Sequence, residues 1–182
     1  MKTLVIVTHP NIHDSMVSKT WVHMLRQHPD RFTVHELYSE YPDGVIDVER
    51  EQALVEEHQN IVLQFPVYWF NCPPLLKQWC DEVLTYGWAY GSKGKAFENK
   101  KLGIAVSLGA PAPEYSEEGS VGYTVAETLR PFELTANYIS ADYQPLFAFH
   151  TIDTYESYDE AAAQQVADSA DDYLAHLNTY YA

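Results

Sequence analysis

The chain has 182 residues, 46% of them hydrophobic and 14% aromatic, which is enough for one folded domain over residues 1–182 and too short for two ordinary ones. Asp and Glu number 26 against 11 Lys and Arg, and a formal charge of -15 disfavours binding to nucleic acid or to an anionic membrane surface. The sequence has no run of about eighteen apolar residues and no signal-peptide pattern, so we expect a cytoplasmic protein that does not insert into a membrane.

Strands are expected to alternate with helices along the first half of the chain. The β-branched run Thr3–Val7 predicts a central strand, and Ser15 is a suitable N-cap for a helix that continues to about residue 28. Alternating polarity over Arg31–Leu37 indicates a second strand, and Asp47–Gln59 has the pattern of an amphipathic helix. The apolar run Asn60–Pro66 then predicts a second buried strand.

The same alternation continues through the second half. Pro73 and Pro74 suit the first turn of a helix, which should end near Gly87. The acidic stretch at residues 152–174 indicates a solvated helix face rather than a catalytic cluster. Between them we expect a strand at Lys101–Gly109, a helix at Thr124–Ala136 with a kink at Pro131, and a last strand within Ile139–Phe149.

This order of elements predicts βαβ units, and therefore an α/β fold with a parallel sheet between two layers of helices. Five strands suit the flavodoxin-like three-layer sandwich, with strand order 2-1-3-4-5. Ligands of such folds bind at the carboxyl ends of the strands, near the point where the strand order reverses. Three segments should therefore meet in space: a first loop (Thr8–Ser15), a second loop (Phe65–Pro73) and a third loop (Ser107–Ser116).

The first loop leads into the start of a helix, where unpaired amides and the helix dipole favour an anion. We predict a phosphate site there, although the sequence has no glycine-rich nucleotide-binding motif. His9 can donate a hydrogen bond to the same phosphate. The other predicted contacts are the Ser15 hydroxyl and the amides of Met16, Val17 and Ser18.

A metal site is the alternative for this loop, because His9 and His13 are four residues apart and Asp14 follows. That spacing places two side chains on one face only within a helix, and Pro10 lies before the expected N-cap. No third ligand is evident nearby in the sequence. We therefore predict no metal ion.

The second loop places three aromatic residues in a row at the end of a buried strand. Such residues also fill cores and oligomer interfaces, and composition alone favours those two explanations. The position at the expected ligand-binding edge instead favours a platform for a planar aromatic ligand. The candidate contacts are Val67, Tyr68, Trp69 and Phe70.

The third loop offers a hydroxyl, a glycine and backbone amides that allow close approach to a ligand. Tyr115 lies a little further along, and taken alone it is an ordinary surface residue, one of 14 tyrosines in the chain. The candidate contacts are Ser107, Leu108, Gly109 and Ala110.

The segment Phe65–Gly91, FPVYWFNCPPLLKQWCDEVLTYGWAYG, closely resembles the strand, flavin loop and helix of the NAD(P)H:quinone oxidoreductase family. Within that family the chain is most similar to the small bacterial branch that includes the ancillary oxidoreductase subunit of glutathione-gated potassium-efflux systems. Leu37–Gln52 and the pair His9 and Pro10 carry the same resemblance. It covers most of the chain and weakens through the C-terminal helix.

The resemblance implies a homodimer that binds FMN or FAD and passes a hydride from NAD(P)H to a quinone by a ping-pong route. The small bacterial branch favours FMN. Carried over to this sequence, the flavin-phosphate contacts fall on His9 and residues 15–18, and the flavin ring contacts fall on residues 67–70 and 107–110. Tyr115 matches a family tyrosine that assists hydride transfer.

Three parts of the sequence depart from the family pattern. Ser18 stands where an asparagine is common, and the run SLGA at residues 107–110 replaces a run rich in threonine and glycine. Ser120 and Val121 occupy the neighbourhood of the histidine that some members pair with the tyrosine matched by Tyr115. The proton relay of those members is therefore expected to be incomplete here.

Our principal hypothesis is an NAD(P)H-linked, flavin-dependent reductase that passes two electrons to quinones or similar electrophiles. The resemblance also suggests a second hypothesis, in which the protein is a regulatory partner that binds to a potassium-efflux transporter. A one-electron carrier similar to flavodoxin is a third class. Such a carrier needs no pocket for a second substrate, whereas the segment Tyr86–Asn99 is long enough to build one, in part across a dimer interface.

Overall fold

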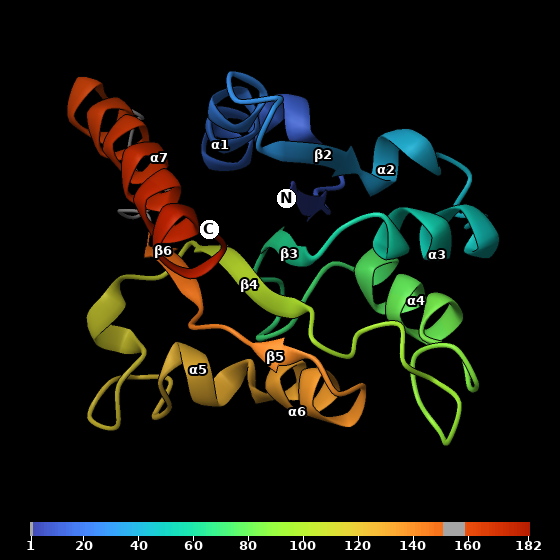
Figure 1. Cartoon of the computed structure of the whole chain (residues 1–182). Helices are drawn as coiled ribbons and strands as arrows, with labels where there is room; N and C mark the ends of the chain where they lie inside the picture. The colour runs from blue at the N-terminus through green and yellow to red at the C-terminus, as the bar shows by residue number, and fades with distance from the viewer. Residues whose placement is uncertain (1, 151–158) are drawn as a thin grey trace.

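A parallel sheet forms the centre of the protein. The computed structural model describes residues 2–150 and 159–182, so residues 152–158 of the acidic stretch lie outside the described residues. The strand order is β2-β1-β3-β4-β5, as predicted, and β6 also pairs with β4 (Figure 1). The strands are β1 (Thr3–Val7), β2 (Phe32–Glu36), β3 (Asn60–Pro66), β4 (Lys101–Leu108), β5 (Asp142–Tyr143) and β6 (Phe147–His150).

Helices connect the strands and cover the sheet. None of the helices within residues 2–150 and 159–182 is long and apolar enough to cross a membrane. Two short 3-10 helices, η1 (Ile12–Asp14) and η2 (Ala112–Glu114), lie in the first and third loops. The α-helices are α1 (Met16–Arg26), α2 (Leu37–Glu40), α3 (Val48–Glu56), α4 (Pro74–Val83), α5 (Val125–Thr128), α6 (Arg130–Tyr138) and α7 (Glu160–Tyr180).

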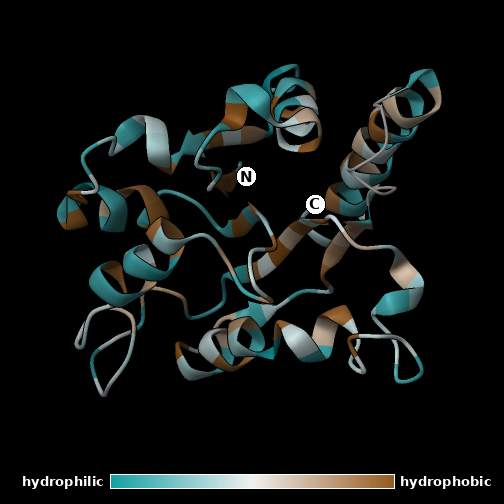
Figure 2. Ribbon diagram, turned by 180° about the vertical axis from the view of Figure 1, so that it is seen from behind, coloured by the Kyte–Doolittle hydropathy of each residue, from teal (hydrophilic) through white to brown (hydrophobic). Residues whose placement is uncertain are grey.

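The two faces of the sheet carry separate apolar cores. Helices α1 and α7 pack on one face around Trp21 and Tyr173, whose ring centroids are 4.8 Å apart. Helices α3, α4 and α6 cover the other face, where Phe65 of β3 packs on Phe132 of α6. Figure 2 shows hydrophobic residues along the central strands and both hydrophobic and hydrophilic residues along the helices, as a three-layer sandwich requires.

Three elements differ from the expectations. The last strand is divided into β5 and β6 around Pro145, which has no amide hydrogen to donate to a ladder. The helix expected at Thr124–Ala136 is two helices, α5 and α6, separated at Leu129, because Pro131 cannot continue the preceding hydrogen-bond pattern and instead lies in the first turn of α6. The short helix α2 follows β2 directly and was not predicted.

A buried carboxylate ties β2, α3 and α4 together. Glu51 of α3 is fully buried and accepts hydrogen bonds from His35 Nε2 at 2.8 Å and from Trp79 Nε1 at 2.8 Å. The Tyr41 hydroxyl donates to the same carboxylate at 2.5 Å. Burial raises the pKa of Glu51, but the hydrogen bonds outweigh burial and the net pKa lies below its usual range. Glu51 is therefore an ionised anchor in the core.

Candidate functional site

The register of the sheet brings the first, second and third loops to one edge. The Thr8 amide, the first after β1, donates to the Gln64 carbonyl of β3 at 2.8 Å. The Val67 amide, the first after β3, donates to the Ser107 carbonyl of β4 at 2.9 Å. Since β3 lies between β1 and β4 in the parallel sheet, all three loops begin side by side at the carboxyl ends of the strands (Figure 1). The predicted convergence is confirmed.

Ser15 begins helix α1 as the sequence predicts. Its hydroxyl oxygen accepts the Ser18 amide at 3.0 Å, so that amide is engaged within the cap rather than directed at a ligand. An α-helix has no internal partner for its first amides, which leaves those of Met16 and Val17 as donors at the start of α1. The Ser15 hydroxyl hydrogen is not used by the cap. The helix start thus presents several donors suited to an anion.

His9 is half-buried in the first loop, and its contacts define which ring nitrogen carries the proton. The Asn11 amide donates to His9 Nδ1 at 3.1 Å. An acceptor Nδ1 has no hydrogen, so in the neutral ring Nε2 is the donor. Burial lowers the pKa of His9, which keeps the ring neutral at neutral pH. His9 therefore offers one N–H donor through Nε2.

His13 and Asp14, which suggested a metal site, form hydrogen bonds with neighbouring residues of the protein. His13 and Asp14 lie exposed in η1, and the Asp14 carboxylate accepts a hydrogen bond from the Asn11 side-chain amide. The Lys19 ammonium binds the His13 carbonyl at 3.2 Å. Within residues 2–150 and 159–182, no group of three or more His, Cys, Asp and Glu side chains is arranged to hold a metal ion.

The second loop is a tight turn that holds two aromatic residues in a strained conformation. Tyr68 and Asn71 exchange backbone hydrogen bonds of 2.8 and 3.0 Å across it. Trp69 and Phe70 between them have φ values of +49° and +61°, as in the mirror-image turns that usually contain glycine or asparagine. Left-handed backbone costs a bulky residue about 1–2 kcal/mol.

This strain keeps two large rings at the surface. Trp69 is 93% exposed and Phe70 is 50% exposed, at the edge where the three loops meet. Neither ring contributes to the core of the protein, so packing within the chain does not explain the strain. Strained backbone of this kind is concentrated at binding sites, where it fixes side chains in place before the ligand arrives.

The third loop begins at the end of β4 and is contacted by a histidine that the sequence did not predict to be there. Ser107 and Leu108 are the last residues of β4, and Gly109 and Ala110 follow at the edge. The Ala110 carbonyl accepts a hydrogen bond from His150 Nδ1 at 2.9 Å. The third loop is thus fixed from the end of β6.

Tyr115 lies against the same histidine. The ring centroids of Tyr115 and His150 are 5.7 Å apart, with the rings tilted by 58°. Burial, together with the charge of Glu114, raises the pKa of Tyr115, so the phenol stays protonated at neutral pH. No pattern in the sequence places His150 here, because the two residues lie 35 positions apart and meet only through the pairing of β4 with β6.

Two buried polar side chains at this edge are without partners. The Thr8 hydroxyl and the Gln64 side-chain amide make no hydrogen bond to any described residue of the chain. Both residues are almost completely buried. Buried polar atoms without partners are rare in folded proteins because each costs about 1–3 kcal/mol. Their presence at the ends of β1 and β3 indicates unused hydrogen-bonding capacity where a polar ligand would lie.

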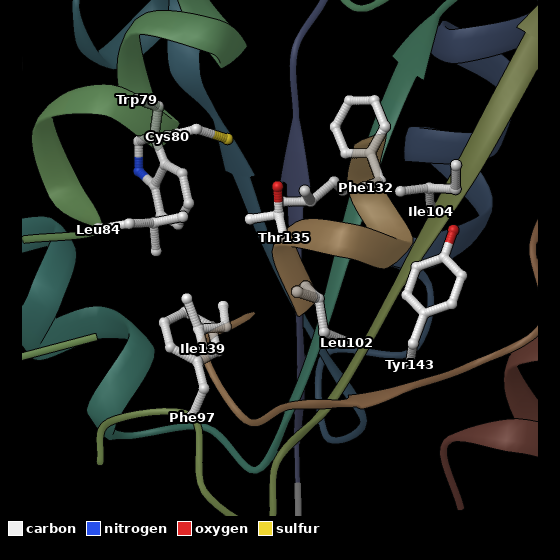
Figure 3. Close-up of a pocket in the computed structure, with 11 residues that line it drawn as sticks. Trp79, Cys80, Leu84, Phe97, Leu102, Ile104, Phe132, Thr135, Ile139 and Tyr143 are labelled. Carbon is white, nitrogen blue, oxygen red and sulfur yellow. The ribbon is translucent and has the colours of Figure 1, made fainter. Parts of the chain in front are cut away.

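The enclosed cavity inside the core is not part of this site. It lies between α4, α6 and β4 and is lined mainly by apolar side chains, among them Trp79, Ile104 and Phe132 (Figure 3). Its volume of about 10 Å³ is at the limit for a single water molecule. It is a packing defect rather than a binding site.

A different hollow lies at the surface near α4 and α6. It has a volume of about 460 Å³ and is lined by Leu84, Tyr90, Leu134, Thr135, Tyr138 and Ile139. Leu134, Tyr138 and the nearby Tyr86 are each at least 60% exposed. The apolar exposure here is larger than single scattered residues would give.

Sequence comparison connects the chain with proteins of this architecture. The model of a family described as Flavodoxin-like fold matches residues 1–177. The uncharacterized NAD(P)H oxidoreductase YrkL of Bacillus subtilis is 53% identical over 147 residues, which cover 81% of this chain and 84% of that protein. The glutathione-regulated potassium-efflux system ancillary protein KefG of Erwinia tasmaniensis is 42% identical over 135 residues, which cover 74% of this chain and 73% of that protein.

Solved structures agree with the fold over nearly the whole chain. General stress protein 14 of Treponema denticola, crystallised in complex with FMN, is 62% identical with a TM-score of 0.93 and covers 98% of this chain and 99% of its own. An NADPH-quinone reductase from P. pentosaceus is 34% identical with a TM-score of 0.81, covering 95% of this chain and 97% of its own.

Proposed function

Because the chain belongs to the flavodoxin-like NAD(P)H oxidoreductase family, we propose that it is an FMN-dependent reductase that takes a hydride from NAD(P)H and passes two electrons to a quinone or a similar electrophile. The observation that carries the proposal is that three segments lie together at one edge of the sheet. They are the start of α1, whose first amides can bind an anion, the turn that exposes the rings of Trp69 and Phe70, and the third loop, whose backbone allows a ligand to approach closely. The FMN complex of the Treponema denticola relative and the quinone reductase from P. pentosaceus support the cofactor and the acceptor class.

The donors of the first loop fit the phosphate end of FMN. His9 offers an N–H through Nε2, the start of α1 offers the amides of Met16 and Val17, and Ser15 offers its hydroxyl hydrogen. All of these groups are donors, which suits a phosphate monoester with several acceptor oxygens. The Thr8 hydroxyl, which has no hydrogen-bond partner among the described residues, suits the hydroxyl-bearing chain between phosphate and ring.

The second and third loops would hold the isoalloxazine ring. Val67 and the aromatic residues 68–70 supply apolar surface, and residues 107–110 supply backbone groups with little side-chain bulk. Bound FMN would accept a hydride and release it again, which is chemistry that the cofactor supplies. The protein supplies a fixed position for the ring and exclusion of water from one of its faces.

A ping-pong route follows if both substrates use the same open space over the ring. NAD(P)H would bind first and leave as NAD(P)+, and the acceptor would then occupy the place that it vacates. Trp69, at 93% exposure, would form one wall of that space. The single chain leaves this wall uncovered on its outer side.

We further propose that a second copy of the chain covers the apolar hollow near α4 and α6. The exposed Tyr86, Leu134 and Tyr138 support this, since solvated aromatic clusters of this kind are typical of subunit interfaces. The expected result is a dimer in sedimentation equilibrium at micromolar concentration. Tyr138→Asp should shift it toward the monomer, whereas an unchanged monomer at all concentrations would contradict the proposal.

The test of the cofactor is direct. The purified protein is incubated with FMN or FAD, dialysed, and examined by absorbance. It should retain FMN in preference to FAD. A protein that stays colourless after dialysis against buffer would contradict the proposal.

The test of the reaction uses anaerobic stopped-flow spectroscopy. NADH or NADPH should bleach the flavin absorbance in a first step, and a benzoquinone added afterwards should restore it. Steady-state rates should give parallel lines in double-reciprocal plots, as a ping-pong route requires. A protein that neither NADH nor NADPH reduces would be a carrier or a binding protein instead.

The relationship to KefG supports one alternative from a different class, a regulatory subunit of a potassium-efflux transporter. The net charge of -15 means that contact with an anionic membrane would have to pass through a protein partner. Co-purification with a membrane protein and slower potassium efflux on deletion of the gene are the expected results. An entirely unattached pool with unchanged efflux would contradict it.

A further inference from the structure

His150 is held at the ligand-binding edge by the backbone of the third loop. Its Nδ1 is 2.9 Å from the Ala110 carbonyl oxygen. A carbonyl only accepts hydrogen bonds, so Nδ1 is the ring nitrogen that carries the hydrogen of the neutral imidazole. A histidine whose ring is oriented by a hydrogen bond through one nitrogen is the arrangement typical of a general acid or base.

The surroundings of the ring support that role. Tyr115 contacts the His150 ring at a centroid distance of 5.7 Å, and both residues are half-buried. Tyr115 remains a protonated phenol at neutral pH, because burial and the charge of Glu114 raise its pKa. His150 also pairs in register with Leu108, the last residue of β4, which places it beside the third loop.

The segment where the family places a histidine is used differently in this chain. The Ser120 hydroxyl donates to the Glu114 carboxylate at 3.0 Å, and the Val121 amide donates to the Glu114 carbonyl at 3.1 Å. These contacts close the loop after η2 on itself. The imidazole beside Tyr115 comes instead from the end of β6.

We propose that His150 donates, through Nε2, the proton that reduction of the acceptor requires, an inference that rests on the proposed function. A quinone becomes a hydroquinone by gaining one hydride and one proton. The hydride originates from NAD(P)H, which is oxidised to NAD(P)+. The imidazolium of His150 gives its Nε2 proton to the quinone oxygen, becomes neutral imidazole, and regains a proton from solvent.

The experiment distinguishes proton donation by His150 from its structural hydrogen bond to the Ala110 carbonyl. His150→Asn retains a side-chain N–H where Nδ1 lies and so keeps the bond to the carbonyl, but it has no titrating group. His150→Phe is the matched control, since it keeps an aromatic ring against Tyr115 and loses both nitrogens. FMN affinity is measured by fluorescence titration for each variant. The acceptor step is measured by mixing dithionite-reduced protein with a benzoquinone, so that NAD(P)H is not needed.

His150→Asn should bind FMN within about twofold of wild type, because the bond to the third loop is kept. Its acceptor step should be slower by about 100-fold or more, the usual contribution of a positioned general acid. The residual rate should rise in proportion to the concentration of imidazole buffer, which then supplies the proton. His150→Phe should show the same slow step and should also bind FMN about fivefold more weakly, as expected for one lost hydrogen bond.

The inference is overturned if His150→Asn binds FMN and passes electrons to the quinone within about twofold of the wild-type rate, without dependence on buffer acid. If His150→Asn does not bind FMN, His150→Gln, whose amide reaches the position of Nε2, is judged by the same two measurements. Wild-type protein that NADH and NADPH both fail to reduce contradicts the proposed function, while the dithionite experiment still decides the role of His150. Wild-type reduced protein that does not react with the quinone overturns both.

Discussion

Replacing Ser15 with alanine should weaken FMN binding far more than it weakens the fold. The hydroxyl oxygen accepts the Ser18 amide at 3.0 Å, and loss of such an N-cap costs about 1 kcal/mol in the free energy of unfolding. For a domain of this size, that corresponds to a fall in Tm of about 2–4 °C. Thermal unfolding of the FMN-free protein measures this part alone.

The effect on FMN is larger because the same hydroxyl hydrogen would bind a charged phosphate. A hydrogen bond to a charged group contributes about 1.5–3 kcal/mol, so Ser15→Ala should raise the FMN dissociation constant by about 10- to 150-fold. Fluorescence titration with FMN gives this number directly. Riboflavin, which lacks the phosphate, should bind the variant and the wild type equally.

A matched control is available in the cap of α5. Thr124 forms a capping box in which its hydroxyl accepts the Glu127 amide at 3.2 Å, and it is not a member of the proposed FMN site. Thr124→Ala should cost a similar amount of stability and leave the FMN dissociation constant unchanged. Equal, small effects of Ser15→Ala and Thr124→Ala on FMN affinity would refute the assignment of the phosphate to the start of α1.

Three further predictions concern the core and the strained turn. Glu51→Gln removes a buried carboxylate. Burial raises the pKa of this carboxylate, but its hydrogen bonds, of which that from His35 is the strongest, lower the pKa by more, so that it lies below its usual value of 4.5. The ionised form therefore stabilises the fold above pH 4.5 and is lost as pH falls, so the stability difference between wild type and variant in urea unfolding should shrink between about pH 6 and pH 3. Gly103→Ala places a Cβ where the hydroxyl of buried Tyr181 lies and should cost about 1–3 kcal/mol in urea unfolding, with part of the loss recovered by adding Tyr181→Phe. Trp69→Gly should stabilise the FMN-free protein by about 1–2 kcal/mol, because glycine adopts a φ of +49° without strain, and should weaken FMN binding; an unchanged Tm would contradict the strain argument.

The sequence predicts best those parts of the fold that depend on local burial. The runs that form β1 and β3 have the same bounds in the structure as in the prediction, because a strand covered on both faces is mostly apolar. The division between β5 and β6 was not predictable in the same way. Both strands are short, and among the described residues they pair only with β4, so their positions depend on a neighbour about 40 residues away.

In the candidate site, too, the backbone arrangement is easier to predict from the sequence than the contacts of individual side chains. Parallel strand order is enough to predict that three loops meet at one edge, and Ser15 can be predicted as an N-cap because serine is favoured at that position. The protonation of His9 at Nε2 depends instead on a single contact from the Asn11 amide. The left-handed conformation of Trp69 and Phe70 contradicts their residue preferences, so only the structure reveals it.

The position of His150 depends on one further feature, the register of β6 on β4. Side chains alternate along a strand, and Phe147 and Phe149 pack on the α1 and α7 face, while Ala148 packs on the face of α4 and α6. His150 therefore shares a face with Ala148, and Tyr115 packs against the core on that same face. A shift of one residue in the pairing would carry the imidazole to the opposite face and expose two phenylalanines in its place. The burial of Phe147 and Phe149 against α1 and α7 is thus what fixes the imidazole beside Tyr115.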